Sequence, residues 1–187
     1  MSDLAYGALG YQGYENPSFL STPGAKDVGI EFYTFSKTFN MAGWRLAFAA
    51  GNDQMIEALN LIQDHLFVGI FPALQEAGIA ALLDPKSEEA VAQLNATYDS
   101  RRDAFVQAAA KIGWQAFPSR GSFYAWMPVP EGYTSESFAD LLLEKVHVAV
   151  APGKGFGPAG DAYVRIGLLV EPERLVEAVD RIANLSF

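Results

Sequence analysis

The chain has 187 residues, of which half are hydrophobic and 19% are charged, and its 13 basic and 22 acidic side chains give a net charge of −9. This much apolar surface excludes a disordered segment. The acidic excess argues against nucleic acid as a partner, because phosphate attracts basic proteins. The absence of cysteine excludes disulfides and thiolate nucleophiles and predicts a cytoplasmic protein. No apolar run reaches the ~18–20 residues of a membrane span, so no membrane partner is expected.

The first part of the chain alternates between strand and helix patterns. Residues 1–29, rich in Gly, Tyr, Pro and Ser, predict a strand end followed by long loops. β-branched and aromatic runs predict strands, and apolar residues at helical spacing predict helices. The strands are expected at 30–35 and 45–50, and the helices at 53–64 (with Asp53 as its cap) and 72–83.

The longest helical pattern runs over residues 87–112 and separates two kinds of sequence. After it, short elements follow one another closely, with a turn at 118–121 between the first two strands. Strands are expected at 114–117, 122–127, 146–151 and 162–167, and helices at 135–145 and 172–185. The sequence therefore predicts an α/β piece over 1–84 and a compact α+β domain over 85–187, which includes the long helix.

The strongest chemical signal lies between the two strands of the first piece, in Thr34-Phe35-Ser36-Lys37. A lysine at the end of an apolar strand is costly to desolvate as a cation, and a lysine just past a strand end is by itself more often a surface residue. Two hydroxyl residues precede Lys37, however, and Arg45 follows it by eight positions after a glycine-containing turn. An amine, a hydroxyl and a guanidinium together suit a cofactor that carries a carbonyl and a phosphate.

The segment SKTFNMAGWR (36–45) resembles the cofactor-lysine signature of the class I/II aminotransferases, which are fold type I enzymes that use pyridoxal phosphate. The resemblance implies that Lys37 carries the cofactor and moves the proton between the substrate α-carbon and the cofactor. It implies that Arg45 and the hydroxyl of Thr34 bind the phosphate. It also implies that residues 1–84 belong to a three-layer αβα large domain and 85–187 to the small domain.

Two further segments extend the resemblance. Asp3-Leu4-Ala5-Tyr6 resembles the family's Asp-x-x-Tyr, in which the Asp pairs with the pyridine nitrogen and the Tyr bonds the ring oxygen O3′. A carboxylate there keeps the ring protonated, so that it can take up negative charge. A pattern of glycines from Pro152 to Gly160, followed by Tyr163-Val164-Arg165, resembles the C-terminal segment that binds the substrate α-carboxylate through Arg165. A frayed terminal carboxylate and a solvated arginine are the alternatives for Asp3 and Arg165.

A complete enzyme of this type is about twice as long, so the chain is expected to be a C-terminal half that lacks the N-terminal half of the enzyme. The resemblance also implies a homodimer. The expected reaction is transamination between an amino acid and a 2-oxo acid. The sequences of residues 17–29 and 36–45 resemble those of the family branch that contains alanine, methionine and diaminopimelate aminotransferases. A β-lyase of the same fold and a non-catalytic fragment remain as alternatives. The two histidines, His65 and His147, have no metal-ligand spacing, and no metal is expected.

Overall fold

The computed structural model describes residues 1–117 and 119–185, so residue 118 of the predicted turn lies outside the described part. The chain divides into two compact units, Met1–Asn95 and Ala96–Phe187. The division falls within α5 (Ser87–Lys111), the long helix that the sequence predicted. The assignment of 1–84 and 85–187 to a large and a small domain stays a prediction.

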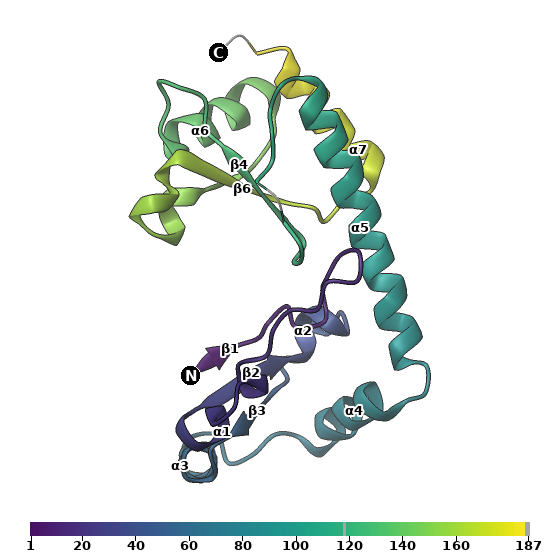
Figure 1. Ribbon diagram of the computed structural model, residues 1–187, viewed down its shortest axis with the longest axis vertical. Coiled ribbons are helices and arrows are strands. Elements are labelled where there is room, and N and C mark those ends of the chain that lie inside the picture. The colour runs from purple at the N-terminus through teal and green to yellow at the C-terminus, as the bar shows by residue number, and fades with distance from the viewer. Residues whose placement is uncertain (118, 186–187) are drawn as a thin grey trace. The chain divides into compact units, whose positions relative to one another are not determined.

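A three-stranded sheet in the order β1-β2-β3 forms the centre of the first unit (Figure 1). Its strands are β1 (Ser2–Asp3), β2 (Ile30–Thr34) and β3 (Ala47–Gly51). β1 runs parallel to β2, and a parallel pair requires a long crossover, here residues 4–29 with the short helices η1 (Phe19–Ser21) and α1 (Ala25–Val28). β3 is antiparallel to β2, and the chain between them forms α2 (Phe35–Thr38) and η2 (Ala42–Trp44).

Two longer helices follow β3, namely α3 (Asp53–Leu66) and α4 (Pro72–Leu83). The predicted cap at Asp53 is wrong. Asn52 has the extended backbone of a capping residue, and its Oδ1 accepts a hydrogen bond of 3.1 Å from the Met55 N–H. α4 is mostly apolar and has no distinct polar face, yet Gly78 is its one buried residue. Such a helix is typical of a protein interior.

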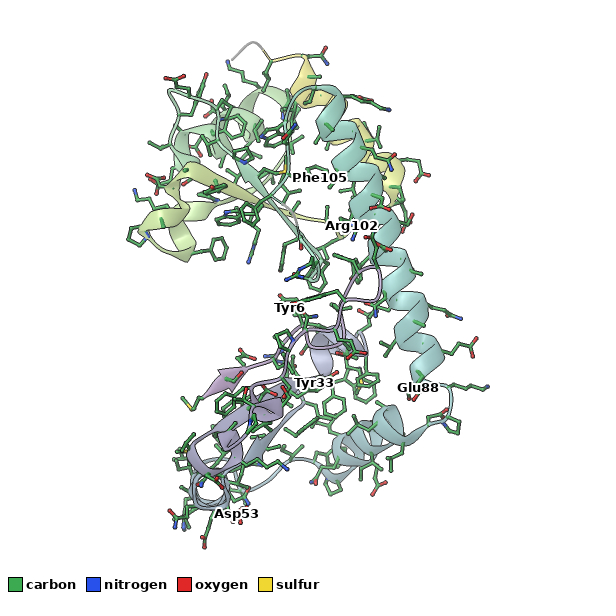
Figure 2. All side chains as sticks on the ribbon, in the orientation of Figure 1. Tyr6, Tyr33, Asp53, Glu88, Arg102 and Phe105 are labelled. Carbon is green, nitrogen blue, oxygen red and sulfur yellow. The ribbon has the colours of Figure 1, made fainter. Side chains whose placement is uncertain are left out.

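The second unit contains the antiparallel sheet β4-β6-β5, made of β4 (Tyr124–Pro128), β6 (Tyr163–Gly167) and β5 (Ala151–Pro152). Side chains alternate along its strands. Residues such as Met127 and Val164 are fully buried, whereas Trp126 and Arg165 are half-buried on the other face. The buried face belongs to a core that includes Phe105 of α5 (labelled in Figure 2) and residues of α6 (Ser135–Val146) and α7 (Pro172–Ala183).

Two of the predicted strands of this unit are wrong. Residues 114–117 form no strand, although the Phe117 N–H donates one hydrogen bond of 2.8 Å to the Trp126 carbonyl. Trp114 is buried instead, and its indole N–H bonds the Pro128 carbonyl at 2.8 Å. Of the residues predicted as a strand at 146–151, residue 151 alone belongs to the sheet. His147 ends α6 in the left-handed conformation and turns the chain there.

A glycine pair folds the segment after β5 into two short helices, η3 (Gly153–Phe156) and η4 (Pro158–Ala162). A Cβ on Gly153 would lie 2.2 Å from the Gly160 carbonyl oxygen, and one on Gly160 would lie 2.1 Å from that of Gly153. The two turns therefore touch through backbone atoms, and a side chain at either position would separate them. This contact explains two glycines of the pattern noted in the sequence.

The two units have the mixed α/β and α+β character that the sequence predicted. Among the described residues, no helix combines the length and the apolar character needed to cross a membrane.

We expect Gly153→Ala to lower the free energy of unfolding by about 1–3 kcal/mol, because the new methyl group would overlap the backbone of Gly160. Gly155→Ala is the matched control, since a Cβ there meets nothing within 4 Å. Urea unfolding followed by tryptophan fluorescence measures both variants. Equal midpoints for the two would contradict the tight contact.

Candidate functional site

Four of the six predicted site residues line one cavity of the first unit. Its volume is ≈ 680 Å³, within the ~300–1,000 Å³ range of small-molecule sites. The lining includes the four predicted residues Asp3, Thr34, Lys37 and Arg45, together with Ser36. The amine of Lys37, the guanidinium of Arg45, the carboxylate of Asp3 and several hydroxyls therefore share a single concave surface.

Lys37 reaches this cavity from α2, a single helical turn that directly follows β2. The turn is fixed by its inward side, because Phe35 and Thr38 are buried at 3% and 4% exposure. Phe35 packs in a small cluster with Met41 and Leu46, and its N–H donates a hydrogen bond of 3.2 Å to the Leu46 carbonyl. Ser36 and Lys37, between the two buried residues, are left on the cavity side.

Thr34 caps this turn. Its Oγ1 accepts a hydrogen bond of 3.1 Å from the Ser36 N–H and donates one of 2.9 Å to Ser36 Oγ. Ser36 is a functional candidate that the sequence analysis noted as a hydroxyl residue but did not assign to the site; its signal was its position between Thr34 and Lys37.

Arg45 lies at the end of η2 with a left-handed backbone (φ 52°, ψ 43°), which residues other than glycine rarely adopt. Its guanidinium is exposed, and Nη1 donates a hydrogen bond of 2.9 Å to the Ala42 carbonyl. The left-handed residue lets the chain enter β3 directly after the turn. A strained backbone at a charged residue of a cavity is a reason to suspect a binding role.

Asp3 enters the cavity from β1, where it lies opposite Phe32 of β2. The strand is short, and its position depends on Glu31, a buried carboxylate of β2. Glu31 accepts hydrogen bonds from Ser2 Oγ at 2.9 Å, Ser18 Oγ at 2.5 Å and the Phe19 N–H at 2.8 Å. Glu31 thus ties β1 and η1 to the sheet, and nothing in the sequence analysis singled it out.

Burial by itself would raise the pKa of Glu31, because a desolvated carboxylate is less stable. The hydrogen bonds from Ser18, Phe19 and Ser2 outweigh burial, and the pKa lies below its ordinary value. Glu31 is therefore held ionised by donors that arrive from β1 and from η1.

Tyr6 and Arg165, the other two predicted site residues, do not line this cavity. Tyr6 is half-buried on the loop after β1 (labelled in Figure 2). Arg165 belongs to the second unit, on the central strand β6, where it lies opposite Trp126 on one side and Ala151 on the other. The described residues contain no group of three or more His, Cys, Asp or Glu arranged for a metal ion.

The sequence is similar to known proteins over nearly its whole length. A family model for class I and II aminotransferases matches residues 1–182. The chain is 59% identical to the L-glutamine--4-(methylsulfanyl)-2-oxobutanoate aminotransferase of Bacillus subtilis (strain 168) and 47% identical to the LL-diaminopimelate aminotransferase of Moorella thermoacetica, each over 98% of this chain. The matched part is 46% of each relative, so the chain spans about half the length of the curated relatives it matches.

Solved structures show the same likeness. The structure of apo-BacF from Bacillus subtilis has a TM-score of 0.93 and 45% identity, and the match covers 99% of this chain and 47% of that one. An aromatic aminotransferase from Pyrococcus horikoshii has a TM-score of 0.92 and 34% identity, with 97% of this chain and 49% of that one covered. These likenesses confirm the predicted fold class.

We expect the stability that Glu31 contributes to be fully present above its ordinary pKa of 4.5 and to be lost as the pH falls through its lower folded-state pKa. Glu31→Gln removes this titration. At pH 7 it should lower the free energy of unfolding by about 1–3 kcal/mol, because the ionised hydrogen-bond acceptor is lost. Denaturant unfolding between pH 7 and pH 3 measures both effects.

Glu57→Gln, at an exposed position of α3, serves as the control for a surface carboxylate. If Glu31→Gln unfolds with the same midpoints as wild type at every pH, Glu31 does not anchor β1.

Proposed function

Because the chain belongs to the class I and II aminotransferases, we propose that it supplies the lysine-bearing half of an enzyme that uses pyridoxal phosphate to transfer an amino group from an amino acid to a 2-oxo acid. The observation that carries this proposal is the cavity in which the Lys37 amine, the Arg45 guanidinium and the Asp3 carboxylate meet.

The donor set of the cavity fits each part of the cofactor. Arg45 would hold the phosphate as a guanidinium, which suits phosphate geometry. The Thr34 hydroxyl would bind the same group, as the family resemblance implies, and the Ser36 hydroxyl, 2.9 Å from it, would add a second donor. Asp3 would pair with the ring nitrogen, and the family resemblance assigns Tyr6 to the ring oxygen.

When bound, pyridoxal phosphate supplies an aldehyde carbon for the amino group and a ring that takes up negative charge. Lys37 Nζ then takes the proton from the substrate α-carbon, which requires an amine on a fixed turn within reach of that carbon. The burial of Phe35 and Thr38 fixes the turn. The Asp3 carboxylate holds a proton at the ring nitrogen, and Glu31 keeps β1 in place for it.

Arg165 would bind the α-carboxylate common to amino acids and 2-oxo acids through two parallel N–H···O bonds. The names of the relatives support substrates from the methionine and diaminopimelate group of aminotransferases. A homodimeric assembly and a cytoplasmic location belong to the same proposal; family resemblance supports the first, and the cysteine-free sequence supports the second.

The exposed apolar surface of the first unit supports a partner half. Large apolar side chains of α3, α4 and the segment between them are exposed, among them Leu61, Leu66, Phe67, Val68, Phe71 and Leu83. Soluble proteins seldom expose so much contiguous apolar surface without a partner. The relatives are about twice as long as this chain, so the other half of such an enzyme is the covering segment that we propose.

We expect pyridoxal phosphate and borohydride to label the chain at Lys37 Nζ, because reduction fixes the bond between an amine and an aldehyde. Peptide mass spectrometry locates the label without any measurement of activity. Lys37→Ala should lose it, whereas Lys26→Ala, at an exposed position of α1, should keep it. Equal labelling of Lys26 and Lys37 in wild type would contradict a dedicated amine.

We expect the half of the Bacillus subtilis relative that this chain does not match to form a complex with the chain and to restore transamination. Size-exclusion chromatography and an assay with a 2-oxo acid acceptor measure the two effects. Leu83→Glu, which charges an exposed apolar position of α4, should weaken the complex at least tenfold, whereas Glu88→Gln on α5 should not. Full activity of the chain alone would contradict the need for a partner half.

A further inference from the structure

The guanidinium of Arg165 lies close to two aromatic rings. Its Cζ is 4.1 Å from the centre of the Tyr124 ring and 4.2 Å from the centre of the Phe156 ring. Both distances are well inside the ~6 Å at which a cation and a ring attract each other. Within the described residues of the second unit, Arg165 forms no ion pair and no hydrogen bond through its guanidinium.

The two rings arrive from different elements. Tyr124 lies on β4 opposite Gly167, and Arg165 lies two residues before Gly167 on β6. A Cβ on Gly167 would lie 3.2 Å from the Leu169 side chain and 3.9 Å from the Tyr124 ring, so both side chains pack beside this glycine. Tyr124 and Arg165 are thus diagonal neighbours on one face of the sheet, a pair within reach of long side chains.

Phe156 arrives from η3, and several contacts hold this short helix in place. The Phe156 ring meets the ring of Trp126 edge-on at 5.8 Å, and Trp126 in turn stacks on Tyr163 at 5.4 Å. The buried Ser135 hydroxyl donates a hydrogen bond of 2.7 Å to Asp161, and the Lys154 N–H donates one of 3.3 Å to the same hydroxyl. Together with the Gly153–Gly160 contact, these bonds fix the segment that carries Phe156.

The position of Phe156 is not explained by core packing. Its side chain is 53% exposed, whereas the hydrophobic core lies on the other face of the sheet. A large apolar side chain held in this way, with one face against a guanidinium, orients the guanidinium rather than filling a core. Two rings close to Cζ restrict the orientation of the guanidinium, while the N–H donors on its rim can still bind a ligand.

We propose that Tyr124 and Phe156 are positioning residues that hold the Arg165 guanidinium so that its N–H rim receives the carboxylate of the substrate. The proposal rests on the proposed function, because it takes Arg165 as the carboxylate ligand. A guanidinium that two rings already hold in place loses little further freedom when it binds, and this lowers the cost of ordering a long side chain.

The first test measures the Arg165 side chain without any substrate. Phenylglyoxal modifies exposed arginines, and peptide mass spectrometry gives the rate at each site. Phe156→Leu and Tyr124→Leu remove one ring each, and each should raise the modification rate of Arg165 about three- to tenfold, the size of one cation–ring contact. Phe156→Tyr and Tyr124→Phe keep the rings and should stay near the wild-type rate. Arg102, whose side chain is 11% exposed, reports on folding in the same sample, and Arg174 serves as the exposed reference.

The second test uses the active enzyme that contains this chain. Both leucine variants should raise KM for the amino acid and the 2-oxo acid about three- to tenfold with kcat changed less than twofold, and both ring-keeping variants should restore KM. A general loss of structure would lower kcat as well.

Unchanged modification of Arg165 in both leucine variants would overturn the proposal, and so would a Tyr124→Phe variant as impaired as Tyr124→Leu. Arg165→Lys distinguishes the carboxylate role of Arg165 from the positioning role of the two rings. Suppose that Arg165→Lys has the KM of wild type although the leucine variants raise the modification rate of Arg165. Arg165 then does not bind the carboxylate, and the rings do not position it for that role. A raised KM for Arg165→Lys with no effect of the leucine variants would leave the proposed function standing and overturn the role of the rings alone.

Discussion

The burial of Phe35 and Thr38 on one side of α2 is the constraint on which the candidate site depends. Positions three apart on a helical turn face the same way, so these two side chains fix the orientation of the residues between them. Ser36 and Lys37 are thereby presented to the cavity, and Thr34 closes the turn from the strand side. A single turn of helix would not hold its shape without this packing, because isolated short helices are unstable in water.

Much of the site was predictable because its residues lie close together in the sequence. Thr34, Lys37 and Arg45 fall within twelve positions, and a turn between two strands brings them to one end of the sheet. The contact between Glu31 and Ser2 spans 29 positions and depends on parallel pairing, which no local pattern reveals. Glu31 therefore looked like an ordinary strand residue, although it fixes the strand that carries Asp3.

The α-helices from 53 onward were predicted within two residues at either end, since their apolar spacing and the prolines at 72 and 172 mark them strongly. The strands at 114–117 and 146–151 failed for a different reason. Both segments are apolar enough for a strand, but tertiary contacts decide their backbone: Trp114 is buried with its indole bonded to Pro128, and His147 turns the chain in the left-handed conformation. Strand patterns depend on partners more than helix patterns do.

The apolar excess of the sequence is unevenly divided between the two units. In the second unit, buried side chains from Phe105 to Ile182 form one cluster around the sheet. The first unit has a small cluster of Phe35, Met41 and Leu46, and its helices α3 and α4 expose large apolar side chains. The residues assigned to the cofactor all lie in the unit whose apolar faces are uncovered, and Arg165 lies in the unit with the larger core. Covering α4 would stabilise the same small cluster that holds α2 in place, since Ala77 and Ala81 of α4 pack against it. If a partner half covers α4 as we propose, its assembly and the placement of Lys37 are coupled through this cluster, whereas the rings that contact the Arg165 guanidinium belong to its own unit.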